Sequence, residues 1–297
     1  MKTFRRILWI GLGALCMSRL PLALPPGASA SPLDLLTQDR PDTAPIPDRF
    51  TLINWNAQKG GDAQFIDDLE DIIERHDPDL MFLQEATEDL TRTRLMAPHF
   101  ARGWRYPWPT GNVVGVMTAS KAESKWVTPL KSRKREFGIT VPKASLASRH
   151  ALKDGQTLLA VNVHCLNFER WGTSGLADQL QDIRRIMQQH EGPILFAGDF
   201  NSWSERRYDL VLNIADELGL TEVDGFSVGR KTGDQGSSLL NRALGIDESL
   251  PLDRVFYRGL MPEACDVLVY DSSDHSALMV TFRLPDAEEP SSSALPD

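Results

Sequence analysis

Five short motifs along the chain place carboxylate, amide and imidazole side chains directly after apolar runs. The motifs are Asn54-Trp55-Asn56, Leu83-Gln84-Glu85, Val163-His164, Gly198-Asp199-Phe200-Asn201 and Ser273-Asp274-His275. Each apolar run has the pattern of a buried strand, so the polar residues are predicted to meet at strand ends around one pocket. A pocket of this composition is suited to metal-assisted cleavage of a phosphodiester.

Phosphodiester cleavage requires a cation on the negative phosphate oxygens, an aligned water and hydrogen-bond donors for the pentacoordinate state. Glu85 is the first candidate metal ligand, because a carboxylate that ends the apolar run 80–83 is costly to bury without a cation. The alternative is a surface glutamate that caps a helix beginning near Thr87. Asn56 is predicted to assist the metal ligand or to hold a phosphate oxygen, and by itself would equally suit a strand-end turn.

The elements that must position these residues alternate between two periods. Strands are predicted at 50–56, 80–84, 113–119, 157–164, 194–198, 252–257, 266–270 and 277–283. Helices are predicted at about 62–75, 174–190 and 205–218. Strands and helices mixed within one large domain predict a layered α/β fold.

The two ends of the chain differ from this domain. Residues 1–30 combine a basic head, an apolar stretch and a small-residue site, which predicts a secretory signal peptide cut after Ala30. An uncleaved N-terminal membrane anchor is the alternative. Residues 31–48 are rich in Pro and Asp and are expected to be a linker, 49–285 to be the domain, and 286–297 to be a disordered acidic tail.

The charge balance is acidic and does not by itself indicate a nucleic-acid partner. The formal net charge is −9, and removal of the four cations in residues 1–30 would lower it to −13. The exception is the basic segment 131–135 with Lys143 and Arg149, which is either a solvated loop or a rim that steers phosphate.

Cys165 and Cys265 would remain after cleavage of the signal peptide, either paired outside the cytoplasm or as small buried thiols.

The order of the motifs resembles the endonuclease/exonuclease/phosphatase superfamily, also called DNase I-like, across residues 49–285. The segments that carry the resemblance are Asn56, Leu83-Gln84-Glu85, 161–167, 197–201, 252–256 and 273–278. Segments 161–168, 198–204 and 251–260 are similar to the YafD-type branch of bacterial proteins. The resemblance implies a four-layer α/β/β/α sandwich, in which two packed β-sheets are each covered by helices.

The resemblance also implies roles for the polar residues. Asp199 would activate or align the attacking water, and Asn201 would donate to oxygens of the transition state. Asp253 would lie behind His275 and support a positive imidazolium. Asp274 would face the metal or the water.

The remaining candidates are less specific. His164 would donate to the leaving oxygen or the phosphate, although a core histidine bonded to backbone fits the same position. Asn167 and Lys143 are candidate substrate contacts. Gln58 stands where some superfamily members carry an acidic residue, which puts a second metal position in doubt.

The expected activity is hydrolysis of a phosphoester by direct attack of water, with Mg²⁺ or Mn²⁺ as cofactor and without a covalent intermediate. The first hypothesis is an exported, monomeric nuclease that acts on DNA or RNA. The second is a phosphoesterase for a lipid or small phosphate ester, favoured by the net acidity and the export signal. The third is a non-catalytic binding protein that keeps the fold.

Overall fold

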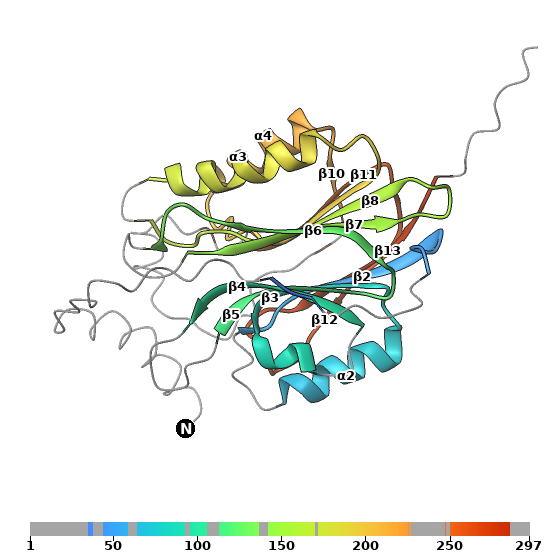
Figure 1. Ribbon diagram of the computed structural model, residues 1–297. Coiled ribbons are helices and arrows are strands. Elements are labelled where there is room, and N and C mark those ends of the chain that lie inside the picture. Colours follow the sequence, from blue (N-terminus) through green and yellow to red (C-terminus); the bar gives the residue numbers. More distant parts are fainter. Residues whose placement is uncertain are drawn as a thin grey trace, which may run out of the picture.

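The chain folds into two β-sheets that pack face to face between two layers of helices (Figure 1). The computed structural model describes residues 35–37, 44–58, 64–92, 96–105, 113–136, 142–169, 172–224, 226, 247 and 250–285. The predicted signal peptide 1–30 and acidic tail 286–297 lie outside these ranges.

The first sheet has seven strands in the order β1-β4-β5-β3-β2-β13-β12. Its strands are β1 (Leu35–Thr37), β2 (Arg49–Asn56), β3 (Leu80–Thr87), β4 (Ala97–Arg105), β5 (Val113–Ser120), β12 (Met261–Leu268) and β13 (Ala277–Arg283). β2 and β3 run parallel at its centre. Their carboxyl ends therefore lie side by side, which brings Asn56 next to the Glu85 region.

The second sheet has six strands in the order β10-β11-β9-β8-β7-β6. Its strands are β6 (Ser124–Lys131), β7 (Ala144–Ala151), β8 (Thr157–His164), β9 (Ile194–Asp199), β10 (Thr221–Glu222) and β11 (Asp253–Arg258). β8 and β9 are again a parallel central pair. Each sheet thus places two strand carboxyl ends in its centre.

Helices cover the outer faces of both sheets, as Figure 1 shows for α2 on one side and α3 and α4 on the other. The helices are α2 (Phe65–His76), α3 (Ser174–Gln188) and α4 (Glu205–Glu217), and a short 3-10 helix spans Glu88–Arg92. α3 buries Leu176, Leu180, Ile183 and Met187, a spacing that forms one apolar stripe. None of the helices in the described ranges combines the length and apolar character needed to cross a bilayer.

Three apolar layers hold this arrangement together. Leu52, Phe82, Leu158, Leu195 and Val255 belong to the core between the sheets, and each is fully or almost fully buried. A second core lies between α2 and the first sheet, and a third between α3, α4 and the second sheet. The predicted four-layer sandwich is therefore confirmed.

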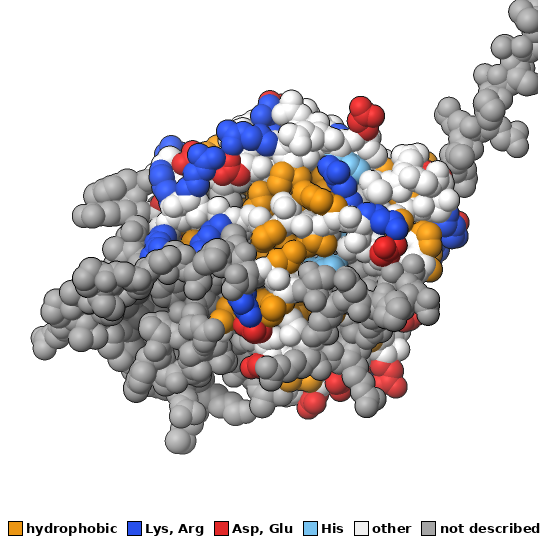
Figure 2. Space-filling model, viewed as in Figure 1, with side chains coloured by type: hydrophobic (Ala, Val, Ile, Leu, Met, Phe, Trp, Pro, Cys, Tyr) orange, Lys and Arg blue, Asp and Glu red, His pale blue; other side chains and the backbone are white. Residues whose placement is uncertain are grey.

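The sequence prediction missed several strands. β4, β6 and β7 were not predicted, because β4 and β6 contain proline and β7 is built largely of small and polar residues. Their strand structure comes from pairing within the sheets. At the β6 edge most side chains are only half-buried, and Figure 2 shows hydrophobic side chains near the middle of that face, with Lys and Arg beside them.

The segment predicted as a linker, 31–48, has parts that pack on the domain. β1 pairs with β4, with Leu35 opposite Ala101. Ile46 is fully buried and forms an isolated bridge with Leu152. Two apolar side chains among Pro and Asp residues are enough to attach these parts of the segment to the sheets, so the contacts of the domain begin before residue 49.

Candidate active site

Three predicted site residues lie in one row across the second sheet. Asp253 of β11 pairs with Asp199 of β9, and Asp199 pairs with His164 of β8. Directly paired residues project their side chains to the same face of a sheet. Gly198 makes this close pairing possible, since its φ is +147° and an added Cβ would lie 2.0 Å from the Val163 carbonyl oxygen.

The first sheet supplies Asn56 and Glu85 from the opposite side of the sandwich. Asn56 donates from Nδ2 to Oδ2 of Asp199 at 2.9 Å, which joins the two sheets through site residues. Glu85 lies where the β3–β5 register shifts between Leu83 and Ala86, and its φ of +48° is left-handed. A bulge redirects a side chain out of the regular alternation, so Glu85 does not end the strand but is turned toward the site within it.

Asp199 is buried, and both of its carboxylate oxygens are engaged. Oδ1 accepts the backbone N–H of Asn201 at 2.9 Å, and Oδ2 accepts the Asn56 amide. Burial, together with the nearby Asp253 carboxylate, raises the pKa of Asp199 to about 7. A carboxylate with a pKa in this range can accept a proton near neutral pH.

His275 is held by Asp253, as predicted. Its Nδ1 lies 2.5 Å from Oδ2 of Asp253, and the Trp55 indole N–H donates to the His275 carbonyl at 3.0 Å. Burial disfavours the charged ring, but the Asp253 carboxylate outweighs this and raises the pKa of His275 to about 10. The imidazolium is therefore the stable form at neutral pH, with Nε2 directed away from Asp253.

Asn201 is fixed in a left-handed conformation, with φ of +50°. Its side-chain Nδ2 donates to the Cys165 carbonyl at 3.0 Å, which leaves the second amide hydrogen for another acceptor. The buried Arg207 donates from Nε to the Asn201 carbonyl at 2.6 Å and from its other nitrogen to the Leu166 carbonyl. Arg207 thus ties together the loops that follow β8 and β9.

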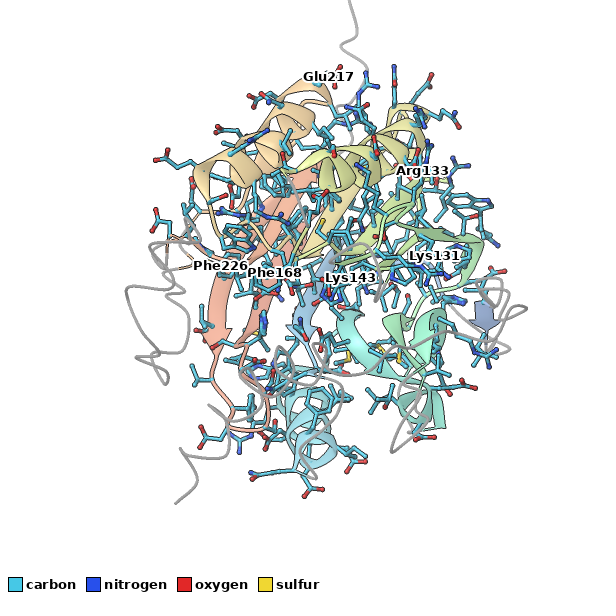
Figure 3. The ribbon with its side chains drawn as sticks, turned by 90° about the vertical axis from the view of Figure 1, so that its left-hand side faces the viewer. Lys131, Arg133, Lys143, Phe168, Glu217 and Phe226 are labelled. Atoms are coloured by element: carbon cyan, nitrogen blue, oxygen red, sulfur yellow. The ribbon has the colours of Figure 1, made fainter. Side chains whose placement is uncertain are left out.

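His164 contacts a lysine as well as the carboxylates. Its Nε2 lies 2.9 Å from Nζ of Lys143 and 3.5 Å from Oδ2 of Asp199. Two protonated nitrogens would not be stable at 2.9 Å, so in this arrangement the lysine donates and His164 accepts through Nε2. Lys143 also lies 3.7 Å from Glu85 and 3.4 Å from Glu136, and Figure 3 shows it on the side of the molecule that faces the viewer.

Asn167 lies beside this group, but its oxygen is already in use. Oδ1 accepts the Trp203 indole N–H at 3.0 Å, and the Asn167 backbone N–H donates to Glu136 at 2.9 Å. Trp203 forms part of the wall of the site. Its ring stacks under the Arg207 guanidinium at 4.9 Å and lies 6.0 Å from the Phe168 ring.

The three predicted metal ligands do not converge in the structure. Glu85 lies against His164 at 3.8 Å, whereas the Asp274 carboxylate is about half exposed, 4.0 Å from Nε2 of His275. Asn56 accepts the Gln58 backbone N–H through Oδ1 at 3.0 Å, and Gln58 accepts the Asp274 backbone N–H. In the described part of the chain, no three His, Cys, Asp or Glu side chains form a metal-binding group.

The donor set nevertheless suits Mg²⁺, which usually takes one or two carboxylates and keeps several waters. Glu85 provides one carboxylate, and the Asn56 amide oxygen has a second lone pair. The Lys143 ammonium and the His164 ring lie 3.7 and 3.8 Å from the Glu85 carboxylate, so a bound cation would compete with the lysine for it. The ligand assignment of Glu85, Asn56 and Asp274 stays a prediction.

Sequence reasoning missed three residues that shape the site. Glu136 lies 3.4 Å from Lys143 and accepts the Asn167 backbone N–H. Arg207 holds the Asn201 loop through the Asn201 carbonyl. Ser273 donates to the Asn56 carbonyl at 2.6 Å. Ser273 lies within a predicted motif and could have been singled out. Glu136 and Arg207 carry no local signal, because each connects a near neighbour to a residue more than 30 positions away, Asn167 and Leu166 respectively.

The two cysteines that follow the predicted cleavage site are free thiols. Cys165 is buried behind Asn201, and Cys265 is exposed on β12 of the other sheet. The alternative of buried thiols therefore holds for Cys165 alone, and the pair does not form a disulfide.

Comparison with known proteins agrees with this geometry. The sequence pattern of the Endonuclease/Exonuclease/phosphatase family matches residues 53–275. The UPF0294 protein YE0917 of Yersinia enterocolitica is 34% identical over 253 residues, which is 84% of this chain and 90% of that protein.

Solved structures share the fold at low identity. An endonuclease/exonuclease/phosphatase from Beutenbergia cavernae superposes with a TM-score of 0.60 and 15% identity, over 80% of this chain and 72% of that one. The 3′ phosphatase NExo from Neisseria, bound to a product DNA hairpin, gives a TM-score of 0.51 and 15% identity, over 78% and 98% of the two chains. At this identity the likeness establishes the architecture alone.

Proposed function

This chain belongs to the endonuclease/exonuclease/phosphatase family, whose members hydrolyse phosphoester bonds, and from this premise we propose that it is a metal-dependent phosphodiesterase that cleaves nucleic acid. The observation that carries the proposal is the position of Asp199 beside Asp253, whose carboxylate holds His275 at 2.5 Å, while Asn56 of the opposite sheet donates to Asp199. The NExo structure, bound to DNA, supports nucleic acid as the substrate class.

Asp199 aligns the attacking water in this proposal. Its two oxygens are oriented by the Asn201 backbone N–H and the Asn56 amide, so the carboxylate keeps one geometry while it takes up a proton. Its raised pKa brings the proton affinity close to that needed at neutral pH. Attack of water follows directly, without a covalent intermediate.

Three donors converge on the negative phosphate. His275 offers its Nε2–H, Asn201 its second amide hydrogen, and Lys143 its ammonium beside His164. Because these donors are held in place before substrate arrives, little reorganisation is needed as charge develops. His164, which accepts from Lys143, acts in this scheme by orienting the lysine.

Enzymes of this family are generally dependent on a divalent metal. Mg²⁺ or Mn²⁺ bound by Glu85 with the Asn56 oxygen would supply positive charge to a phosphate oxygen. Asp274, at the rim, would complete the site through water.

The alternative substrate is a lipid or small phosphate ester. The net charge of −9 favours it, because a polyanion is repelled by an acidic protein.

Export through residues 1–30 is part of the proposal, and N-terminal sequencing of the protein recovered from the cell envelope checks it. Cleavage after Ala30 is expected, whereas an intact N-terminus on membrane-bound protein indicates the anchor.

The proposed function is tested with the full chain on a substrate panel. Supercoiled plasmid, single-stranded RNA, phospholipids and sugar phosphates are each incubated with Mg²⁺ or with EDTA. Nicking of plasmid that requires Mg²⁺ supports the nuclease. Release from a lipid or small ester alone assigns the protein to the alternative, and no hydrolysis of any ester contradicts both.

A further inference from the structure

The row of site residues on the second sheet continues to the edge of that sheet. Ser145 of β7 pairs with Val163 of β8, so Ala144 stands beside His164 in the same register. Ala144 in turn pairs with Lys131, the last residue of β6. At about 4.8 Å between neighbouring strands, Lys131 lies two strands, or about 10 Å, from His164 and projects to the same face.

The basic segment around Lys131 divides into a paired half and an unpaired half. Arg133 donates to both oxygens of Asp182 on α3, at 3.0 and 2.7 Å, and Lys134 donates to Ser174. In contrast, within the ranges that the structure describes, no carboxylate lies within 4.0 Å of Lys131 or Arg135. The uncompensated charges of the segment are therefore those of Lys131, Lys134 and Arg135. Of these, only Lys131 and Arg135 are half-buried, because Lys134 is exposed beside Ser174.

Lys131 and Arg135 are close enough to affect each other. Both are half-buried, and burial together with the Arg135 guanidinium lowers the pKa of Lys131. Two neighbouring cations that are partly removed from water destabilise each other, and an anion bound between them relieves that cost. The position therefore has the electrostatic character of an anion site.

The backbone connects this pair to the catalytic lysine. The Ser132 N–H donates to the Lys143 carbonyl at 2.9 Å, and the Lys143 N–H donates to the Ser132 hydroxyl at 2.9 Å. Figure 3 shows Lys131, Arg133 and Lys143 on the same side of the molecule. Lys131 and Lys143 therefore keep a fixed separation.

We propose that Lys131 and Arg135 form a second phosphate-binding site, which holds a backbone phosphate of a polynucleotide about three nucleotides from the phosphate that is cleaved. The inference rests on the proposed function and names its substrate more closely. Phosphates of one strand repeat at about 3.4 Å along a stacked helix, so a site about 10 Å from His164 lies about three nucleotides away. A small phosphate ester cannot reach both sites.

The test compares a double variant with a matched control. Lys131→Gln with Arg135→Gln removes the two half-buried cations, whereas Arg133→Gln removes a cation already neutralised by Asp182. For a single-stranded 12-mer, kcat/KM of the double variant should fall roughly 10- to 100-fold, as expected when one or two charged hydrogen bonds are removed. For bis(4-nitrophenyl) phosphate it should change less than about twofold, since that diester has no second phosphate.

Binding is measured separately from turnover, by fluorescence anisotropy of a labelled 12-mer in EDTA. The slope of log Kd against log salt should fall by about 0.7 for each phosphate that the double variant no longer neutralises, with Arg133→Gln unchanged. Equal affinity of the double variant and the natural protein, or an equal weakening in Arg133→Gln, overturns the second site. Binding of phosphatidylglycerol vesicles but not of the 12-mer through these two cations overturns the polynucleotide assignment.

The two proposals fail in different ways. Hydrolysis of the small diester without any binding of the 12-mer overturns the second site and leaves a phosphoesterase. Binding of the 12-mer that depends on Lys131 and Arg135, without hydrolysis of any ester, supports the second site and contradicts the proposed catalysis.

Discussion

Two clusters built around histidine lie between the sheets, and they differ in the groups that surround the rings. At the site, His275 contacts the Asp253 carboxylate at 2.5 Å. Six residues, or about 20 Å, along β7 from the site row, His150 instead contacts hydroxyls, from Ser148 at 2.9 Å and Ser124 at 3.4 Å. Ser124 also bonds His99 of the first sheet at 2.7 Å, so this cluster also joins the sheets.

The two rings are both largely removed from water, yet at neutral pH the His150 ring is neutral and the His275 ring is protonated. Burial lowers the pKa of His150 to about 3, since its hydroxyl partners do not replace the hydration of a charged ring. At His275 the carboxylate reverses this effect and raises the pKa to about 10. The carboxylate partner, and not burial, therefore distinguishes a histidine able to stabilise a phosphate from one that stabilises the fold.

The largest change is expected from Asp199→Asn, which retains the shape of the side chain but removes the group that accepts a proton. We expect kcat on bis(4-nitrophenyl) phosphate to fall by up to roughly 10⁴-fold, the upper end of the range for loss of a general base. Thermal unfolding should stay close to that of the natural protein. A variant that retains more than a tenth of the activity would show that Asp199 is not the base.

Asp253→Asn makes the surroundings of His275 resemble those of His150. Without the carboxylate, the pKa of His275 should fall from about 10, and activity should drop roughly 10²- to 10³-fold at pH 8. In the natural protein the stability from this pair is complete below about pH 6.5 and is lost as pH rises through about 10. Ring titration by NMR measures the pKa directly, and an unchanged value contradicts the account.

Glu85→Gln tests whether the site end, unlike the His150 end, binds a divalent cation. At a Mg²⁺ concentration of 100 times Kd, the natural protein should gain about 3 kcal/mol of stability from binding. The variant should gain almost none. The measurement is the unfolding temperature as a function of Mg²⁺ concentration. The control is Glu123→Gln, a change at an exposed glutamate. The same rise in unfolding temperature in both variants would show that the cation binds at a site other than Glu85.

The smallest effect is expected from His150→Gln, and it concerns stability alone. A histidine kept neutral by the fold contributes stability that is complete above about pH 6.5 and is lost as pH falls toward about 3. In the natural protein the free energy of unfolding should fall by roughly 1 kcal/mol per pH unit in this range because of His150. Urea unfolding between pH 4 and 7 should show a shallower slope in His150→Gln than in the natural protein.

The layers and the central site could be predicted from the sequence because both have local signals. Apolar runs that end in Asn56, His164 and Asp199 belong to the central parallel strands, where burial makes the pattern strong. β4 and β6 lack this pattern, because both contain proline and β6 is an edge strand whose side chains are mostly half-buried. The Asp253–His275 pair was expected only from the family resemblance, since 22 residues separate the two in sequence.

The finer site contacts could not be predicted. The bulge that turns Glu85 depends on pairing with β5, and the left-handed Asn201 depends on the Cys165 carbonyl and on Arg207. The predicted burial of Cys265 was wrong because β12 is an edge strand whose side chains are mostly exposed. For Glu85 and Asn201, a deciding partner, β5 and Cys165 respectively, lies about 30 or more residues away along the chain.

Plasmid nicking by three forms of the full chain, with Mg²⁺ and with EDTA, tests most directly whether this site is catalytic. The forms are the natural protein, the double variant Asp199→Ala with His275→Ala, and His150→Gln. At pH 7.5 we predict nicking that needs Mg²⁺ in the natural protein and in His150→Gln, and none in the double variant. Nicking by the double variant at the natural rate would contradict the assignment of this site.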